Sequence, residues 1–231
     1  MLPIRDIHTN ARRIRPVVNI LLIATNVLVF FFELSLGPRL EAFLMSAAYI
    51  PARGGGVAVG ATSALVSMFL HGGWGHLLGN MLFLWIFGDN VEDRLGHVRY
   101  LIFYILCGYA ATFAHAFFNA GSTMPAIGAS GAISGVLGAY LFLYPRARIL
   151  TLVWFFIFVR FIEIPALVFL PIWFLMQFIS GVSSLRAVDP AAAGGVAWFA
   201  HIGGFIAGPV LLLLLGGARR PRSQPPPLPP W

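Results

Sequence analysis

Four polar residues lie within or beside long apolar stretches, where polar side chains are costly and often functional. They are His76, Asn80, Ser130 and His201. A serine and a histidine that meet in a pocket can act as a nucleophile and its general base. His76 and Asn80 are four residues apart, so on a helix they share one face and can donate hydrogen bonds to an oxyanion. These residue types therefore indicate serine-based hydrolysis, provided that the fold brings them together.

Glycine-rich motifs surround both candidate catalytic residues. GASG at 128–131 places Ser130 at the predicted start of a helix, where unpaired N–H groups and the helix dipole favour negative charge. HIGGFIAG at 201–208 begins with the candidate base. The glycines of these motifs are predicted to mark close helix packing, namely Gly128, Gly131, Gly204 and Gly208. Close approach of the two helices would bring the serine to the histidine.

The composition sets the class of protein that must position these residues. The chain has 231 residues, of which 59% are hydrophobic and 10% are charged, whereas soluble domains carry about 25% charged residues. This excludes an ordinary soluble domain and predicts a polytopic membrane protein. All 15 basic residues are arginines, and they are scattered between apolar runs. The net charge of +7 therefore indicates membrane topology rather than nucleic-acid binding.

Apolar runs and their breakers divide the chain into a short N-terminal segment (1–15), a membrane domain (16–216) and a tail (217–231). The tail holds six prolines and is predicted to be disordered or polyproline II. Six helices are expected in the membrane domain, at 16–36, 74–90, 97–118, 129–144, 162–181 and 196–215. Residues 37–73 are predicted to form a long loop, and 149–160 an interfacial or re-entrant piece.

The arginines also predict the orientation. With both termini in the cytoplasm, the inner segments carry twelve arginines and the outer segments carry three, as the positive-inside rule requires. The second, fourth and sixth helices then begin near the outer surface. His76 with Asn80, Ser130 and His201 lie near the beginnings of these three helices, so they are expected to meet at a similar depth below that surface.

At this point the sequence resembles the rhomboid family of intramembrane serine proteases, over roughly residues 70–215. Four motifs carry the resemblance in the family's order: HGGWGHLLGN at 71–80, VEDRLG at 91–96, GASG at 128–131, and His201 followed by Gly204 and Gly208. The resemblance implies an all-α bundle of six transmembrane helices. It also implies a Ser130–His201 dyad and an oxyanion hole made by the Ser130 N–H with His76 and Asn80.

The resemblance implies that transmembrane proteins in the bilayer are the substrates, and it implies neither a metal nor an organic cofactor. A multi-pass position in a cell membrane follows, and the plasma membrane of a prokaryote is the predicted location. A transmembrane helix hides its peptide bonds in its own hydrogen bonds, so it must open locally before attack. Because the site is expected near the outer ends of its helices, cleavage is expected near the outer end of the substrate helix. The alternative is a catalytically silent rhomboid-like protein that binds membrane clients.

Some features depart from the family pattern or stay open. Residues 37–70 contain no Trp-Arg pair, and Ser134 stands one turn after the nucleophile, where some relatives carry an aromatic residue. What orients His201 is therefore open, and a dyad without a third carboxylate is predicted. His71 either belongs to the site or orders the end of the first loop. The aromatic stretch 154–178 is predicted to be lipid-facing or interfacial.

Overall fold

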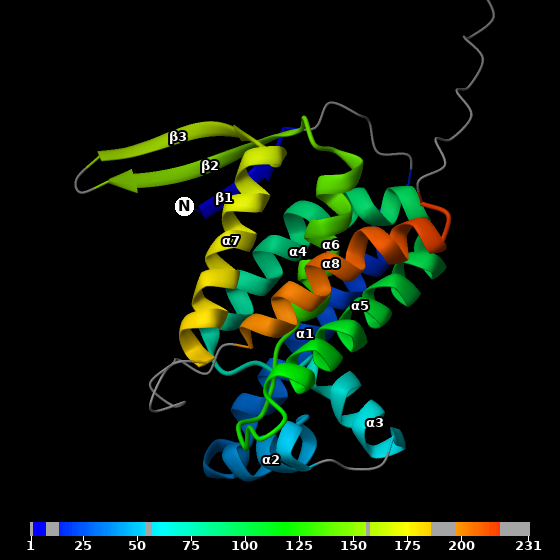
Figure 1. The fold of residues 1–231 in the computed structure, drawn as a ribbon, viewed down its shortest axis with the longest axis vertical. Coiled ribbons are helices and arrows are strands. Elements are labelled where there is room, and N and C mark those ends of the chain that lie inside the picture. Colours follow the sequence, from blue (N-terminus) through cyan, green and yellow to red (C-terminus); the bar gives the residue numbers. More distant parts are fainter. Residues whose placement is uncertain (1, 8–13, 54–56, 156–157, 186–196, 218–231) are drawn as a thin grey trace, which may run out of the picture.

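The structure is a computed structural model that describes residues 2–7, 14–53, 57–155, 158–185 and 197–217. A bundle of helices forms its body, with a small sheet at one end and a segment of short helices at the opposite end (Figure 1). The tail predicted from 217 onward lies outside the described residues, apart from Gly217.

The long helices overlap the six predicted ranges, but the second continues to Leu95, beyond its predicted end at 90, and the fifth begins at Ala166 rather than at 162. Their bounds are α1 (Val17–Ser35), α4 (Trp74–Leu95), α5 (His97–Phe118), α6 (Ser130–Leu143), α7 (Ala166–Leu185) and α8 (Trp198–Leu214). Two of the described helices, α1 and α5, are long and apolar enough to cross a membrane on their own. Three shorter apolar stretches lie at Ser130–Leu143, Ala166–Met176 and Trp198–Leu214.

Helix α6 is the centre of the bundle. Every residue from Gly131 to Tyr140 is buried, which requires apolar or small side chains around the whole circumference of the helix. Its most extensive neighbours are α8 and α5, and α4 and α7 pack on it as well. A residue at the first turn of α6 is therefore enclosed by other helices.

The described chain also contains a three-stranded antiparallel sheet, so the prediction of an all-α protein is wrong for this part. The strands β1 (Leu2–Asp6), β2 (Arg148–Phe155) and β3 (Phe158–Pro165) pair in the order β1-β2-β3. The physical reason is composition, since RILTLVWF and FVRFIEIP are rich in β-branched and aromatic residues. The predicted interfacial piece at 149–160 is thus mostly strand, and its hairpin extends sideways from the bundle (Figure 1).

Two carboxylates make polar contacts at the sheet end of the molecule, Asp6 partly buried and Glu92 buried. Asp6 of β1 accepts hydrogen bonds from Asn90 Nδ2 at 3.0 Å and from the Tyr140 hydroxyl at 3.3 Å. Glu92 of α4 accepts hydrogen bonds from the Val18 and Asn19 amides in the first turn of α1, at 3.0 and 2.7 Å. Because the first amides of a helix have no partner within it, Glu92 anchors the beginning of α1.

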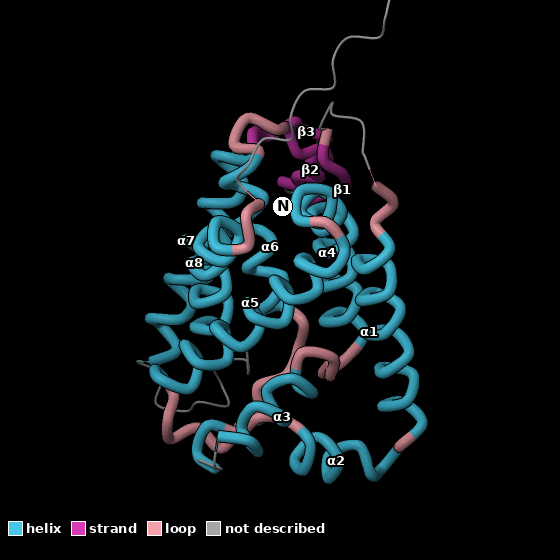
Figure 2. The backbone as a smooth tube through the Cα atoms, turned by 90° about the vertical axis from the view of Figure 1, so that its right-hand side faces the viewer, coloured by secondary structure: helices cyan, strands magenta, loops and turns pink. Residues whose placement is uncertain are grey.

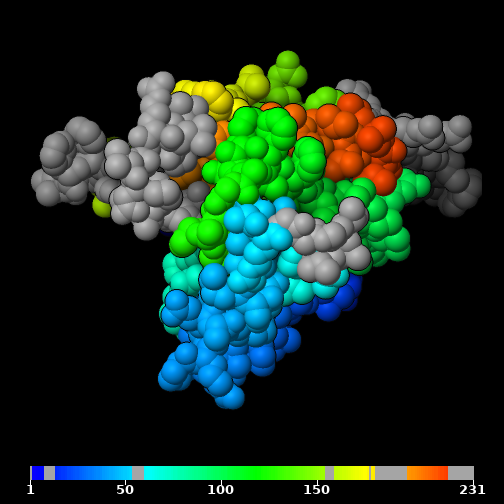
Figure 3. Space-filling model, turned by 60° about the horizontal axis from the view of Figure 1, so that its bottom comes forward, coloured from blue at the N-terminus to red at the C-terminus, as the bar shows by residue number. Residues whose placement is uncertain are grey.

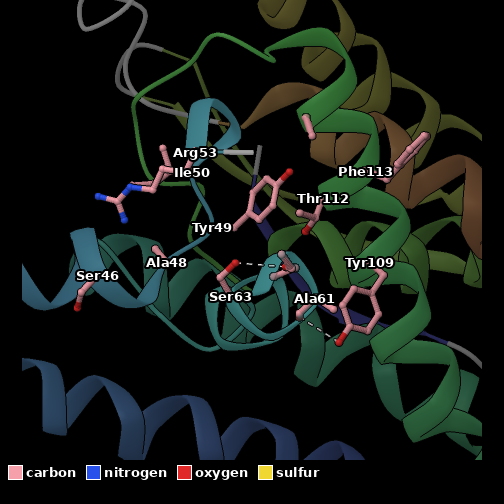
Figure 4. Close-up of a pocket in the computed structure, with 13 residues that line it drawn as sticks. Ser46, Ala48, Tyr49, Ile50, Arg53, Ala61, Ser63, Tyr109, Thr112 and Phe113 are labelled. Atoms are coloured by element: carbon pink, nitrogen blue, oxygen red, sulfur yellow. Dashed lines mark hydrogen bonds between the residues drawn. The ribbon is translucent and has the colours of Figure 1, made fainter. Parts of the chain in front are cut away.

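The segment 37–73, predicted as a loop, contains α2 (Leu40–Ala47) and α3 (Val57–Ser67), with 3₁₀ turns at Gly37–Arg39 and Pro51–Arg53. These elements lie at the end of the bundle farthest from the sheet (Figure 2), and from that end they form a protruding ridge (Figure 3). A cavity of about 430 Å³ lies between this segment and α5. Tyr49, Arg53 and Thr112 line it, and the Tyr109 hydroxyl donates to the Ala61 carbonyl there (Figure 4).

Candidate active site

The first residue of α6 and the first turns of α8 carry the two residues predicted to be catalytic. The Ser130 hydroxyl oxygen and His201 Nε2 are 2.7 Å apart, within hydrogen-bond distance. His201 is buried and Ser130 is partly exposed. This is the distance that a nucleophile and its general base require.

Glycines allow the two helices to approach closely enough for this contact. A Cβ added at Gly204 would overlap the carbonyl oxygen of Gly131, and one at Gly208 would overlap that of Gly135. At Gly131 a Cβ would lie 2.6 Å from the Cβ of Ala111 in α5. The backbones of α6 and α8 are therefore in direct contact along these positions, as small residues permit.

Ser130 and Ser134 are one turn apart on α6, and their hydroxyl groups have different hydrogen-bond partners. Ser130 is the first residue of the helix, so its backbone N–H belongs to the group that has no intrahelical acceptor. Ser134 instead donates its hydroxyl hydrogen bond to the Ser130 carbonyl at 2.7 Å, the common role of serine within an apolar helix.

His76 in the first turns of α4 lies against the backbone before Ser130. A Cβ added at Gly128 would lie 2.6 Å from His76 Nε2, and Gly128 has a φ of 122°, which only glycine adopts easily. The Gly72 N–H donates to His76 Nδ1 at 3.4 Å. Since Nδ1 then acts as an acceptor, the neutral imidazole carries its proton on Nε2, beside Gly128 and Ser130.

Asn80 is one turn further along α4, and its orientation is set by His71. Asn80 Nδ2 and His71 Nε2 are 3.0 Å apart, and His71 Nδ1 is 3.2 Å from the Phe69 carbonyl oxygen. His71 lies in the loop between α3 and α4, where burial, reinforced by the neighbouring His76, lowers its pKa to about 4. The neutral ring therefore donates from Nδ1 to Phe69 and accepts at Nε2 from Asn80.

A cavity of about 650 Å³ joins these groups. Its lining includes His76, Asn80, Ser130 and His201, so all four predicted residues face one space. The fold thus brings together side chains from α4, α6 and α8 that are far apart in sequence. Within the described ranges, no group of three or more His, Cys, Asp or Glu side chains is arranged to hold a metal ion.

Two tryptophans flank His201, and the sequence did not predict either contact. The ring of Trp173 in α7 lies 6.0 Å from the His201 ring at an interplanar angle of 35°, and the Trp198 ring lies 6.0 Å away at 89°. Trp173 is partly buried and lines the cavity, so the expectation of a lipid-facing or interfacial aromatic stretch is wrong for this residue. Some relatives carry an aromatic residue at the position of Ser134; here the aromatic rings beside His201 come from α7 and α8 instead.

The carboxylate of Glu33, near the end of α1, reaches this region but not the candidate base. It accepts a hydrogen bond from the backbone N–H of His71. The one signal in the sequence was an acidic residue inside an apolar helix, and its partner could not be inferred from spacing.

These features define a helical bundle with a serine–histidine pair at an internal cavity, and the comparisons with known proteins agree with that class. A family model described as "Rhomboid domain" matches residues 59–218. The chain therefore belongs to the rhomboid family and is embedded in a membrane.

Relatives occur in bacteria and in mitochondria. "Rhomboid protease GluP" of Bacillus subtilis is 42% identical over 78 residues, which are 34% of this chain and 15% of that protein. "Rhomboid protein 1, mitochondrial" of Saccharomyces cerevisiae is 35% identical over 95 residues, 39% of this chain and 28% of that protein.

A third relative matches a longer stretch. "Presenilin-associated rhomboid-like protein, mitochondrial" of Bos taurus is 29% identical over 153 residues, 62% of this chain and 35% of that protein. The matched segments thus span between 15% and 35% of the length of these three relatives.

Proposed function

We propose that the protein is an intramembrane serine endopeptidase that cleaves transmembrane substrates with a Ser130–His201 dyad. The observation that carries the proposal is the 2.7 Å contact between Ser130 Oγ and His201 Nε2 at a cavity that His76 and Asn80 also line. The name of the GluP relative, a rhomboid protease, supports the same class of activity.

The proposed reaction proceeds through an acyl-enzyme on Ser130, with His201 moving the proton in each step. His201 Nε2 takes the hydroxyl proton of Ser130 while Oγ attacks the scissile carbonyl carbon. The resulting oxyanion accepts hydrogen bonds from the Ser130 backbone N–H, His76 Nε2–H and Asn80 Nδ2–H. His201 then gives the proton to the leaving amine, and a water molecule hydrolyses the acyl-enzyme by the same steps.

The proposal includes six membrane spans with both termini on the cytoplasmic side, which the arginine distribution supports. The ends of α4 and α8 that carry His76 and His201 are then near the outer surface. A substrate helix would have to unwind locally before attack, so cleavage is expected near its outer end, with Gly or Pro lowering the cost. The plasma membrane of a prokaryote remains a prediction, because the relatives include bacterial and mitochondrial proteins.

The test is cleavage of a model transmembrane substrate by the purified full chain in detergent and in liposomes. We expect wild type to cleave and to react with a fluorophosphonate probe, and Ser130→Ala to do neither. Ser134→Ala is the matched control, since it removes a hydroxyl one turn away that bonds only to the helix backbone in the structure, and it should retain activity.

Mass spectrometry of the products then locates the cut in the substrate. Cuts in the outer third of the substrate span support the proposed orientation, and cuts at the cytoplasmic end contradict it. A well-folded wild type that neither cleaves nor reacts with the probe would overturn the protease proposal and favour the catalytically silent client-binding protein.

A further inference from the structure

A buried carboxylate connects the first helix to the candidate site. Glu33 is 1% exposed in α1, and both of its carboxylate oxygens lie within hydrogen-bond distance of the His71 backbone nitrogen, at 3.1 and 3.2 Å. An acidic side chain buried in an apolar helix is costly unless its hydrogen bonds are satisfied. The contact spans 38 residues of sequence, so it fixes a loop against a helix rather than a local turn.

His71 touches both side chains proposed to bind the oxyanion, but it forms a hydrogen bond with only one of them, Asn80. It is 1% exposed, its Nε2 accepts the Asn80 amide at 3.0 Å, and its ring packs edge-on against the His76 ring with 5.1 Å between centroids. Each of its polar groups named so far has a defined partner: the backbone N–H binds Glu33, Nδ1 binds the Phe69 carbonyl, and Nε2 binds Asn80.

We propose that Glu33 is a positioning residue for the oxyanion hole, acting through His71 on Asn80. The terminal torsion of asparagine is broad and has no sharply preferred angle, so the direction of its amide depends on its partner. One N–H of Asn80 Nδ2 is directed to His71, and this leaves the second N–H in a fixed direction. This role presupposes the protease function proposed for Ser130 and His201.

The location of the contact gives the inference a kinetic signature. Glu33 is not among the residues that line the cavity, so it does not touch a bound substrate. A group that only orients an oxyanion donor affects the transition state and leaves ground-state binding unchanged. Loss of the Glu33 contact should therefore lower kcat and leave KM nearly constant.

The first experiment compares three variants of the full chain in liposomes. Glu33→Leu removes both acceptor oxygens and should lower kcat about tenfold, part of the effect of losing an oxyanion donor. Glu33→Gln keeps a carbonyl acceptor for the His71 N–H and should restore kcat to within about threefold of wild type. Asn26→Leu is the matched control: Asn26 is buried in the same helix and its amide donates to the Leu22 carbonyl within it, so kcat should not change.

The second experiment asks whether Glu33 acts through Asn80. In the Asn80→Ala background, Glu33→Leu should cause no further loss of kcat, because the amide that it positions is absent. If Glu33→Leu does not fold, Glu33→Met, which also lacks an acceptor oxygen, replaces it in the same cycle. His71→Phe tests the second contact separately, since it keeps the backbone N–H for Glu33 but removes the acceptor for Asn80. Rescue by glutamine together with non-additivity supports the inference.

The contrary outcomes are separable from failure of the proposed function. If wild type cleaves but Glu33→Leu changes only KM or only the thermal stability, or lowers kcat equally in both backgrounds, the positioning role is wrong and the protease remains. If wild type is folded but inactive, the proposed function itself is wrong.

Discussion

The two ends of α1 make the same kind of contact with different consequences. At the sheet end, the Glu92 carboxylate of α4 accepts the Val18 and Asn19 amides of α1. At the cavity end, the Glu33 carboxylate of α1 accepts the His71 amide. Both are buried carboxylates that accept hydrogen bonds from backbone N–H groups of another segment. The Glu92 contact joins α1 to α4, and the Glu33 contact joins α1 to the loop that carries His71.

The difference lies in what each contact leads to. The hydrogen bonds of Glu92 hold a helix terminus and the neighbouring His97 side chain, and Glu92 does not line the cavity with Ser130 and His201. The hydrogen bond of Glu33 continues through His71 to Asn80, which does line it. Polar groups at the sheet end therefore stabilise the fold, whereas those at the cavity end also set the direction of hydrogen-bond donors.

The largest effect that separates the two ends is expected for Asn80→Ala. Loss of an oxyanion donor costs about 3–4 kcal/mol of transition-state stabilisation, so kcat should fall by roughly 10²-fold with little change in KM. Steady-state kinetics in liposomes measure it. A higher KM at unchanged kcat would instead assign Asn80 to substrate binding and weaken the contrast.

Glu92→Ala should show the opposite pattern. It leaves two amides in the first turn of α1 without their acceptor, which should lower the free energy of unfolding by about 3 kcal/mol. Reversible unfolding in mixed detergent measures the loss, and kcat per folded molecule should stay near wild type. A specific loss of kcat with unchanged stability would show that the sheet end also acts on the site.

Gly204→Ala tests whether the site depends on the contact between α6 and α8. The added Cβ would overlap the Gly131 carbonyl, so stability should fall by about 2 kcal/mol, and fluorophosphonate labelling of Ser130 should slow. Gly121→Ala is the control, because a Cβ at this glycine meets nothing within 4 Å and Gly121 does not line the cavity. Equal behaviour of the two variants would mean that the helices separate without cost.

The smallest effect is expected for Trp173→Leu. The indole lies 6.0 Å from the His201 ring, and loss of an aromatic contact is worth about 1 kcal/mol. Labelling by fluorophosphonate should therefore slow by roughly fivefold. Trp85→Leu, at an exposed tryptophan of α4, should label at the wild-type rate. A similar loss in both variants would show that Trp173 has no specific effect on the reactivity of Ser130.

Local patterns in the sequence were sufficient to predict the six long helices, but not the short helices α2 and α3 in the segment predicted as a loop. The bounds of α5 match the predicted 97–118, and those of α6 and α8 lie within the predicted ranges. Apolar runs and breakers are local signals, so they do not depend on tertiary contacts. The strands β2 and β3 were missed, because a short apolar run alone does not distinguish a strand from an interfacial helix.

By itself, the sequence determined the class of protein, its long helices and the four polar residues that face the cavity, because composition and motif spacing are properties of the chain. Only the tertiary structure decided which side chains support those four. The contacts of Glu33 with His71, and of Trp173 with His201, join residues far apart in sequence. No periodicity relates such positions, since the packing of α1, α4, α7 and α8 around α6 is what brings them together.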